Sequence, residues 1–328
     1  MIVVPVDDAS QVAQARRQAV AVAAASGATK AQCDTLALVV TELSTNLLKH
    51  AGGGEIVVRA GDAGLDVLAL DRGPGIDDVA ASMADGYSTA GTPGNGLGAV
   101  RRLCRDMRVL SWRGVGTAVF ARLAGGAGSH ASEDDGIAGL EVPMRGEEAC
   151  GDAWSSHRDA HGRTVMLVDG LGHGAEAAIA AHAAVREFQR QRTQPAARII
   201  EALHDALRPT RGGAVAVARI DWDAALVTFA GVGNIAAVLR AADGTARRLV
   251  SHNGTVGLTA RRIQPFDYPI AQGGLLVMHS DGIGTRWSMD RYPGLSQAHP
   301  MLVAGVLYHQ HGRGRDDAGI VVARTGRP

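Results

Sequence analysis

Residues 71–76 read Asp-Arg-Gly-Pro-Gly-Ile and directly follow an expected strand at Gly64–Asp71. Residues 94–98, Gly-Asn-Gly-Leu-Gly, run into an expected helix at Leu97–Arg105. A carboxylate at a strand end can accept a hydrogen bond from an adenine amino group, and glycines before a helix leave N–H groups free for phosphate. The small, polar segment between them, residues 85–93, is typical of a mobile lid. Together the two segments predict a nucleotide site.

An expected helix at Thr29–His50 precedes these segments, and Thr29 with Gln32 forms a capping-box pattern at its start. Its apolar stripe consists of Leu36, Val40, Leu43 and Leu47. Another face carries polar residues at helical spacing, Glu42, Asn46 and His50, with Lys49 beside them. Such a stripe suits a metal ion and phosphates, although for this helix alone a solvated face is the simpler interpretation. A P-loop is excluded, because the sequence holds no G-x-x-x-x-G-K-[ST] segment.

The order ELSTN (42–46), DRGPGI (71–76) and DGYSTAGTPGNGLG (85–98) resembles the Bergerat-fold (GHKL) ATPases. Within them it is most similar to the switch-protein serine/threonine kinases of bacterial partner-switching pathways, over residues 8–123. The resemblance implies ATP and Mg²⁺ as cofactors. It implies that Glu42 is the general base, that Asn46 binds Mg²⁺ and that Asp71 reads adenine. Phosphoryl transfer also needs charge neutralisation, for which the cation of Lys49 is suited. The glycines that would frame the nucleotide are Gly73, Gly75, Gly94, Gly96 and Gly98.

A second set of acidic residues stands at the ends of expected strands in the later part of the chain. These residues are Asp152 in GDAW, Asp169 after the strand Arg163–Val168, Asp281 after Leu275–His279, and the pair Asp316-Asp317 before Ile320–Ala323. Carboxylates gathered at strand ends suit Mg²⁺ or Mn²⁺, but an Asp-Gly pair is also an ordinary turn signal. The turn Gly170-x-Gly172-x-x-Ala175 matches a dinucleotide-binding form as well. That interpretation is disfavoured because Asp169 would repel the pyrophosphate and the remainder lacks βαβ alternation.

The series GDAW, VDGLGHG, AGVGNI, SDGI and RDDAGIVVAR resembles the SpoIIE branch of the metal-dependent PPM (PP2C-like) serine/threonine phosphatases, over residues 137–325. The resemblance implies two Mn²⁺ or Mg²⁺ ions. Asp169 would bridge both, the Gly170 carbonyl and Asp152 would serve the first, and Asp281 and Asp316 the second. It leaves Asp317 outside the metal-binding set and makes residues 231–234 a structural turn. His173 would contact either substrate phosphate or its own loop.

The composition sets the general class. The chain has 328 residues, about twice the usual domain size, with 33 basic and 33 acidic residues and 4% aromatic residues. The balanced charge argues against duplex DNA binding and the few aromatics against single-stranded nucleic acid. Three scattered cysteines and the lack of a signal peptide or long apolar run predict a cytoplasmic protein that does not enter a membrane.

Two α/β domains are expected, joined by the Gly/Ser-rich, acidic segment at residues 125–136, for which a long surface loop is the alternative. The first domain, residues 1–124, would be a Bergerat-fold α/β sandwich. The second, residues 137–328, would be a PP2C-like αββα sandwich. Further expected elements are Ser10–Ala25, Gly116–Leu123, Ala175–Gln191, Ala214–Ile220 and Leu226–Ala230.

The two resemblances together imply a bifunctional regulator of partner switching. The first domain would phosphorylate Ser or Thr of a STAS-domain antagonist or scaffold protein, and the second would remove that phosphate. Further partners would be a sigma factor or a downstream phosphatase or cyclase. One alternative is a phosphatase whose nucleotide domain only binds partners. Another is a non-catalytic interaction protein, against which the intact Glu42/Asn46 pair and the strand-end aspartates argue.

Overall fold

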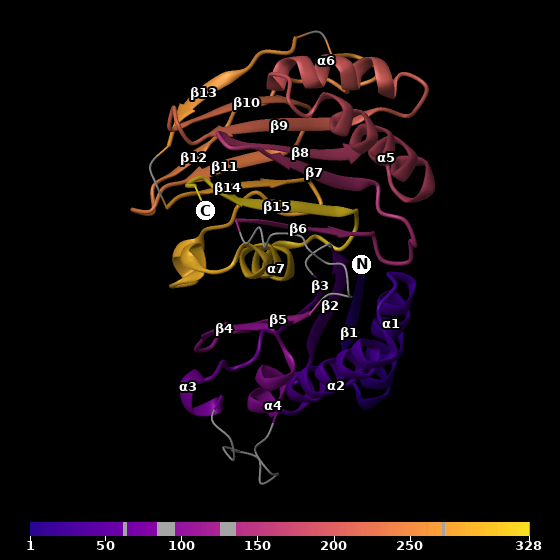
Figure 1. Cartoon of the computed structure of the whole chain (residues 1–328), viewed down its shortest axis with the longest axis vertical. Coiled ribbons are helices and arrows are strands. Elements are labelled where there is room, and N and C mark those ends of the chain that lie inside the picture. Colours follow the sequence, from indigo (N-terminus) through magenta and orange to yellow (C-terminus); the bar gives the residue numbers. More distant parts are fainter. Residues whose placement is uncertain (62–63, 84–95, 125–135, 261, 271–272, 328) are drawn as a thin grey trace. The chain divides into compact units, whose positions relative to one another are not determined.

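The computed structural model describes residues 1–61, 64–83, 96–124, 136–260, 262–270 and 273–327. The chain divides into two compact units (Figure 1). The N-terminal unit is Met1–Asp134 with the short segment Tyr292–Leu295, and the C-terminal unit is Asp135–Arg291 with Ser296–Pro328. The segment expected as a linker lies outside the described residues up to position 135, so the exact domain limits stay a prediction.

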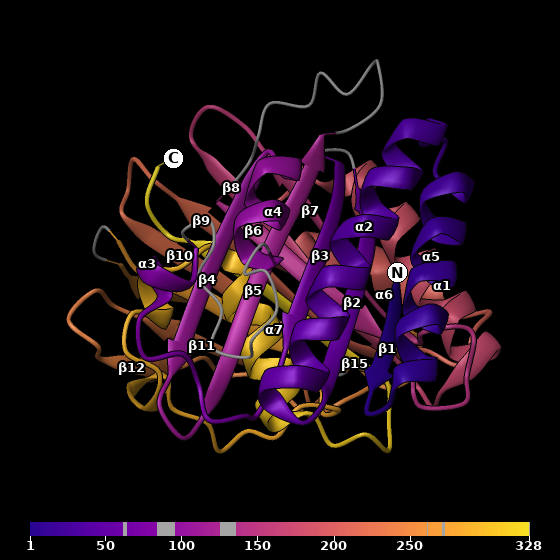
Figure 2. The same cartoon turned by 90° about the horizontal axis from the view of Figure 1, so that it is seen from below.

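The N-terminal unit contains a five-stranded antiparallel sheet in the order β1-β2-β3-β5-β4. Its strands are β1 (Ile2–Val6), β2 (Gly54–Gly61), β3 (Gly64–Leu70), β4 (Asp106–Trp112) and β5 (Gly116–Ala124). Its helices are α1 (Ala9–Ala25), α2 (Lys30–Asn46), α3 (Val79–Ser82) and α4 (Gly96–Leu103). Figure 2 shows α1, α2 and α4 over one face of the sheet.

Local chemistry explains where the two long helices begin. Asp8 caps α1 and Thr29 caps α2, each in a capping box with the Gln three residues later. The expected stripe of α2 is buried, with Leu36, Val40, Leu43 and Leu47 all at most 3% exposed. It packs against apolar residues of the sheet, such as Ile56 and Val67. The polar face of α2, which carries the candidate residues, is thereby turned away from the core.

The C-terminal unit contains two five-stranded antiparallel sheets, in the orders β13-β10-β9-β8-β7 and β12-β11-β14-β15-β6. The strands of the first are β7 (Asp152–Arg158), β8 (Gly162–Gly170), β9 (Gly213–Asp221), β10 (Leu226–Val232) and β13 (Phe266–Pro269). Those of the second are β6 (Ile137–Val142), β11 (Ala236–Arg240), β12 (Ala246–Arg248), β14 (Leu275–His279) and β15 (Ala318–Arg324). Apolar side chains of both sheets form one core, which includes Leu167, Phe229 and Met278.

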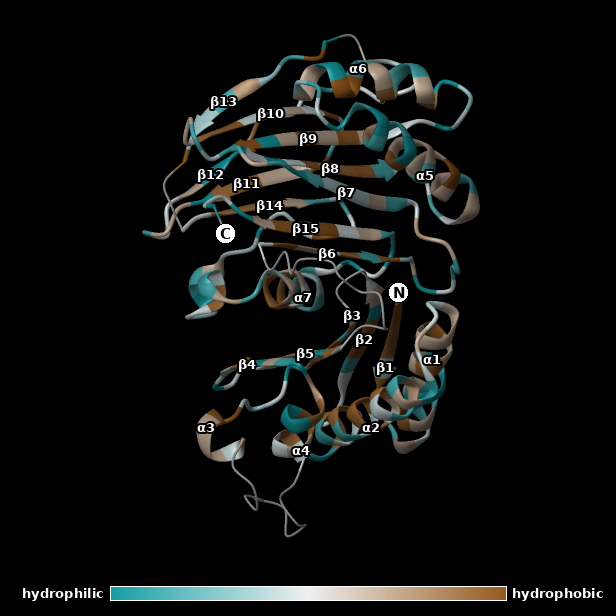
Figure 3. Cartoon of the chain, in the orientation of Figure 1, coloured by the Kyte–Doolittle hydropathy of each residue, from teal (hydrophilic) through white to brown (hydrophobic). Residues whose placement is uncertain are grey.

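Helices cover the outer face of each sheet. Helices α5 (Gly174–Gln191) and α6 (Ala196–Leu207) contact the first sheet, and α7 (Pro300–His311) contacts β6 and β15 of the second. Two 3₁₀ turns at Met289–Arg291 and Leu295–Gln297 precede α7. Figure 3 shows hydrophobic colouring along strands such as β9 and β15, as expected for sheets buried on both faces. The layers therefore run helix, sheet, sheet, helix, which confirms the predicted αββα sandwich.

The C-terminal end of the second helix differs from the sequence expectation. The helix expected to run to His50 is α-helical only to Asn46 and continues as a π-helical turn, Leu47–Ala51. Gly52 ends it in a left-handed conformation, at φ 74°. Separately, no helix among the described residues is long and apolar enough to cross a bilayer.

Candidate active sites

The polar face of α2 presents Glu42 and Asn46 one turn apart, both half-buried. Lys49 and His50 follow in the π-helical turn and are exposed. A π-helical turn is rare and is found often at functional sites. Here it changes the rotation of the chain after Asn46, so that His50 does not follow the α-helical spacing predicted for it.

Gly96, the first residue of α4, lies directly against this face. A methyl group added at Gly96 would stand 3.3 Å from both Nδ2 and Oδ1 of Asn46 and 3.7 Å from Oε2 of Glu42. Gly98 is buried within the same helix. The structure thus brings the start of α4 to the Glu42/Asn46 pair, while Gly94 lies outside the described residues, as does the expected lid.

Asp71 follows β3 and is held in one orientation by the backbone. Its Oδ1 accepts hydrogen bonds from the N–H groups of Gly73, at 2.8 Å, and Thr117, at 3.0 Å. A methyl group at Gly73 would come within 2.7 Å of Ala51, and one at Gly75 (φ 81°) within 2.5 Å of the Trp112 carbonyl oxygen. Both glycines are therefore required by packing in this loop, whether or not they also frame a nucleotide.

Two hydroxyls that sequence reasoning missed complete this region. The Thr117 Oγ1 lies 2.9 Å from the Oγ of Ser111, which accepts a hydrogen bond from the Ile76 N–H at 2.7 Å. They join β4 and β5 to the loop after Asp71. Their only sequence signal is a pair of hydroxyl residues at the turn end of two apolar strands. The carboxylate of Glu42 and the amide of Asn46 offer oxygen ligands of the kind that Mg²⁺ prefers. The cation of Lys49 and the oriented carboxylate of Asp71 suit the phosphates and the base of a nucleotide.

In the C-terminal unit, Asp152 and Asp169 face each other across neighbouring strands. Asp152 begins β7 and pairs directly with Asp169 near the end of β8. Directly opposed side chains lie on the same face of a sheet, about 5 Å apart at Cβ. The second sheet adjoins them, since a methyl group on Gly319 of β15 would stand 2.9 Å from the Asp152 Cβ.

The two other predicted acidic ligands reach the same end of the sandwich. Asp281 follows β14 and Asp316 precedes β15, the strand that pairs with β14. Gly170 ends β8, and its N–H donates to the Gly151 carbonyl oxygen at 2.9 Å. The fold therefore gathers all five predicted metal-binding residues of this unit on adjoining strand ends.

Burial and neighbouring carboxylates raise the pKa values of this acidic pair. Burial raises the pKa of Asp169 to about 8, with further contributions from the charges of Asp152, Asp281 and Asp316. Burial likewise raises the pKa of Asp152 to about 7; a hydrogen bond from Ser280 lowers it in part. Burial and the neighbouring negative charges thus both disfavour the ionised form of these two carboxyls, which a bound cation would favour.

A hard cation fits this arrangement. The Oδ2 atom of Asp152 is buried and has no hydrogen-bond partner within the described ranges, which is unfavourable for a carboxylate oxygen unless a cation takes that place. All the donors are oxygens, as Mg²⁺ and Mn²⁺ prefer. In the part of the chain that the structure describes, no three His, Cys, Asp or Glu side chains form a ready-made metal-binding group.

Asp317 and His173 make contacts within their loops. Asp317 accepts from the Met144 N–H at 2.6 Å and the Gly151 N–H at 2.7 Å, so both its oxygens tie down the loop between β6 and β7. The Nδ1 of His173 lies 2.8 Å from Oε1 of Glu147 in that same loop. Of the two alternatives for His173, the structure therefore shows the loop contact.

Asn234 has a contact that the turn interpretation missed. Its Nδ2 donates to Oδ2 of Asp281 at 2.8 Å. The preceding Gly233 has φ 103°, and a methyl group there would stand 2.4 Å from the Ala214 Cβ, so only glycine fits. Sequence gave no signal for the pairing, because the two residues are 47 positions apart.

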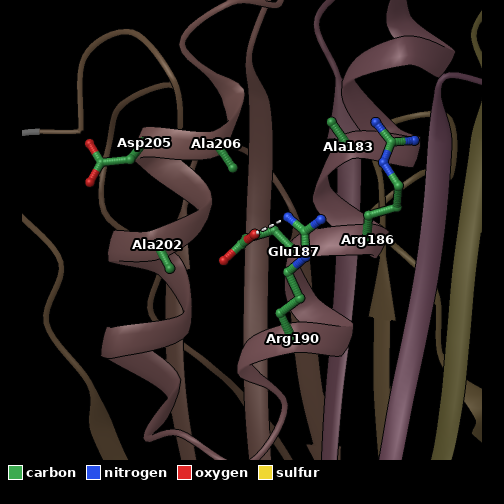
Figure 4. A pocket seen from close by; sticks show the side chains of 7 residues that line it. All are labelled: Ala183, Arg186, Glu187, Arg190, Ala202, Asp205 and Ala206. Atoms are coloured by element: carbon green, nitrogen blue, oxygen red, sulfur yellow. Dashed lines mark hydrogen bonds and ion pairs between the residues drawn. The ribbon is translucent and has the colours of Figure 1, made fainter.

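A hollow of about 570 Å³ lies between α5 and α6 (Figure 4). None of the predicted site residues lines it. Its lining residues are Ala183, Arg186, Glu187, Arg190, Ala202, Asp205 and Ala206. Its acidic residues already have partners, since Glu187 pairs with Arg190 at 3.1 Å and Asp205 with Arg208 at 3.1 Å.

Two known families match the chain in succession. Residues 4–123 match the family described as "Histidine kinase-like ATPase domain", and residues 159–326 match "Stage II sporulation protein E (SpoIIE)". The chain therefore joins a GHKL-type domain to a SpoIIE-type PP2C domain, which confirms both resemblances.

Relatives of both kinds are known from Bacillus subtilis. The serine/threonine-protein kinase RsbT is 41% identical over 86 residues, which are 25% of this chain and 65% of RsbT, so less than two thirds of that kinase is spanned. The phosphoserine phosphatase RsbX is 22% identical over 143 residues, 44% of this chain and 72% of RsbX.

Two solved structures are similar to the chain. One, described as "The bacterial stressosome: a modular system that has been adapted to control secondary messenger signaling", is 29% identical with a TM-score of 0.53, covering 57% of this chain and 98% of that one. RsbX in complex with magnesium is 19% identical with a TM-score of 0.51, covering 57% and 94%. This second likeness concerns the fold alone.

Proposed function

We propose, from the premise that this chain belongs to the Stage II sporulation protein E (SpoIIE) family, that its C-terminal unit is a metal-dependent phosphatase acting on phosphoserine or phosphothreonine. The observation that carries the proposal is the Asp152–Asp169 pair at the head of two adjacent strands. Two like charges placed opposite each other in a sheet are unfavourable unless a cation compensates them. A function that needs the cation explains why the sequence holds both.

The roles of the residues follow from their places on the strands. Asp169 would contribute to the binding of two Mn²⁺ or Mg²⁺ ions. Asp152 and the Gly170 carbonyl would hold the first ion, and Asp281 and Asp316 would hold the second. When bound, such an ion pair lowers the pKa of a water between them and neutralises phosphate charge. Asp317 and the Glu147–His173 pair hold the neighbouring loops in place, which keeps the carboxylates oriented.

We propose that the N-terminal unit is a protein serine/threonine kinase that uses ATP. Asn46 would bind Mg²⁺, Lys49 would contact the phosphates and Asp71, oriented by two backbone N–H groups, would read adenine. Glu42 would accept the proton of a substrate Ser or Thr hydroxyl. The hydroxyl oxygen would attack the γ-phosphorus of ATP, and ADP would leave. The close approach of Gly96 to Glu42 and Asn46 supports this, because it brings the start of α4, where the phosphates would bind, to the proposed base.

Opposed activities on one chain suit a partner switch. The proposed substrate of both units is a STAS-domain antagonist or scaffold protein, phosphorylated by one unit and dephosphorylated by the other. A sigma factor, or a downstream phosphatase or cyclase, would sense the outcome. The similarity to RsbT and RsbX supports this reading by analogy. The second candidate is a phosphatase whose N-terminal unit binds nucleotide and partner without transferring phosphate, favoured by the short span of the kinase match.

One experiment separates these functions. Phosphate release from a phosphoserine-bearing STAS protein is measured with Mn²⁺ or with EDTA, and transfer from γ-labelled ATP is then measured on the dephosphorylated protein. We expect release to require Mn²⁺ and to be lost in Asp169→Asn. We expect transfer to be lost in Glu42→Ala but kept in Asp34→Ala, an exposed acidic control on the same helix. Release without any transfer would favour the second candidate. If the chain catalyses neither release nor transfer, both candidates are rejected.

A further inference from the structure

Three loops at the Asp169 end of the first sheet present exposed side chains that folding does not explain. Leu171 lies in the loop between β8 and α5, Arg211 in the loop between α6 and β9, and Leu258 in the loop after β12. Leu171 is 52% and Leu258 54% exposed, and Arg211 is exposed as well. We call these three residues the rim.

Hydrogen bonds fix the three rim loops to one another. The Leu171 N–H donates to the Gly212 carbonyl oxygen at 3.0 Å. Gly213 and Val256 exchange backbone hydrogen bonds of 3.0 and 2.8 Å. A methyl group at Gly212 would stand 3.4 Å from the Cγ of Leu258. The rim is therefore a fixed part of the surface and not three independent loop tips.

The strand register places the rim beside the proposed metal site. Asp169 pairs with Ala214 and Gly170 with Gly213 across β8 and β9. Leu171 follows Gly170 directly, and Arg211 precedes this pairing by two residues. A protein segment whose phosphorylated residue reached Asp169 would therefore pass over or next to the rim.

Arg211 differs from the arginines around it. A methyl group at Gly172 would stand 3.4 Å from its Nη1, so the guanidinium lies against the loop that follows Asp169. Within the described ranges it has no hydrogen bond or ion pair. Nearby Arg208 pairs with Asp205 at 3.1 Å, and Arg219 with Asp159 at 2.8 Å. An unpaired guanidinium beside a carboxylate-rich site is suited to an anionic group on an incoming partner.

The two leucines indicate what else the partner carries. Burying a large apolar side chain is favourable, and these two are left mostly in water. Grouped exposed apolar residues next to a charged group mark interaction sites more often than single ones do. Among the described residues of this unit, Ile179 and Val250 are exposed to a similar degree. Ile179 lies on α5, and Val250 lies eight residues before Leu258 in the segment between β12 and β13, so neither is a rim residue.

We propose that the rim is the docking surface for the segment of the substrate protein that carries the phosphorylated residue. Apolar side chains flanking the phosphorylated Ser or Thr pack on Leu171 and Leu258, and an acidic side chain of the same segment pairs with Arg211. The inference rests on the proposed phosphatase function and adds to it a sequence preference: leucine-like and acidic residues next to the phosphorylated one.

Two synthetic phosphopeptides test the rim on the full chain with Mn²⁺. One has leucine and glutamate on both sides of a phosphoserine, and the other has glycine at those positions. The readout is the ratio of kcat/KM for the first peptide to that for the second. General damage to the enzyme lowers both values and leaves their ratio unchanged, so the ratio reports docking alone.

We expect the wild-type ratio to be well above one and to fall about tenfold in Arg211→Glu and in the double variant Leu171→Ser, Leu258→Ser. Matched controls are Arg198→Glu, an exposed arginine on α6, and the double variant Ile179→Ser, Val250→Ser. These controls keep the wild-type ratio. A wild-type ratio near one, or an unchanged ratio in the rim variants, would overturn the docking surface.

A binding measurement keeps this outcome separate from the phosphatase proposal. If the wild-type chain hydrolyses neither peptide, the phosphatase proposal fails, and fluorescence anisotropy of the labelled peptides in EDTA still tests the rim. Tighter binding of the leucine-glutamate peptide, lost in the rim variants, supports the rim. Equal binding of the two peptides contradicts it.

Discussion

The side chain of Asn234 donates a hydrogen bond to Asp281, with 2.8 Å between Nδ2 and Oδ2. The bond joins the turn after β10 to the end of β14, and it fixes one oxygen of a carboxylate that we assign to metal binding. Groups that orient a metal ligand commonly contribute 10–100-fold to metal affinity. The turn at residues 231–234 therefore positions a functional residue in addition to reversing the chain.

Asn234→Ala should weaken Mn²⁺ binding by about 10–100-fold, because Asp281 would be free to rotate away from the site. Isothermal titration calorimetry of the purified chain measures this without relying on turnover. Asn253→Ala is a matched control, since Asn253 is also exposed and lies in a loop of the same unit. Equal Mn²⁺ affinity in the two variants would show that the Asn234 contact is only structural.

The Asp152–Asp169 pair predicts an unusual effect of pH on the metal-free protein. Both pKa values are raised in the folded chain, to about 7 and about 8, so folding favours the protonated carboxyls. Their stabilising contribution is complete below the unfolded-state value of 3.8 and is lost as the pH rises through 7 and 8. In EDTA the Tm should therefore fall between about pH 6 and pH 9.

Mn²⁺ should reverse this fall, because the cation compensates the ionised pair. Asp152→Asn should raise the Tm in EDTA at about pH 8 and reduce the gain from Mn²⁺. Glu148→Gln is the control, an exposed acidic residue of the same unit. Differential scanning calorimetry follows all three proteins. A metal-free Tm that rises with pH in this range contradicts our account of the pair.

The sequence predicted elements best where local signals were strong. The start of α2 was readable from Thr29 and Gln32, and its buried stripe from the spacing of the leucines. Helix α7 was not predicted, because the run Pro300–Leu307 is apolar on every side and has no periodic polar face. The switch to a π-helical turn after Asn46 has no residue pattern of its own, so the α-helical spacing predicted for His50 was wrong.

The candidate sites divide in the same way. Motifs identified Asp152 and Asp169, but only the register of β7 with β8 shows that they face each other. Asn234 contacts Asp281, and Arg211 lies against the loop at Gly172, in each case many positions away along the chain. Such long-range contacts cannot be predicted from a single sequence. The residues of a site at strand ends can thus be predicted from sequence motifs. The contacts that orient these residues depend on tertiary structure and cannot.

Gly96→Ala should weaken binding of Mg²⁺-ATP by about tenfold with little change in stability. The added methyl group would stand 3.3 Å from the Asn46 amide, which must shift by a few tenths of an ångström and would lose its position as a ligand. Alanine otherwise favours a helix over glycine, so the Tm should not fall. Gly61→Ala is the control, because the nearest atom there is 3.7 Å away. Unchanged nucleotide affinity in Gly96→Ala would remove Asn46 from the proposed site.

His279 predicts a loss of stability in mild acid. The ring is buried at 1% exposure, with Nδ1 2.8 Å from the Ser280 carbonyl oxygen and Nε2 accepting from Trp287 Nε1 at 3.1 Å. These contacts require the neutral ring, protonated at Nδ1, because a proton on Nε2 would face the indole N–H.

Burial, above all, lowers the pKa of His279 below its ordinary 6.5. A base whose folded pKa is lowered contributes stability that is complete above 6.5 and is lost as the pH falls through the folded value. The Tm should therefore drop as the pH falls below 6.5. His279→Gln should flatten this dependence, since glutamine does not titrate, whereas His182→Gln, at an exposed position of α5, should keep it. If both variants lose stability in acid as the wild type does, the acid sensitivity arises elsewhere and the neutral ring is not its cause.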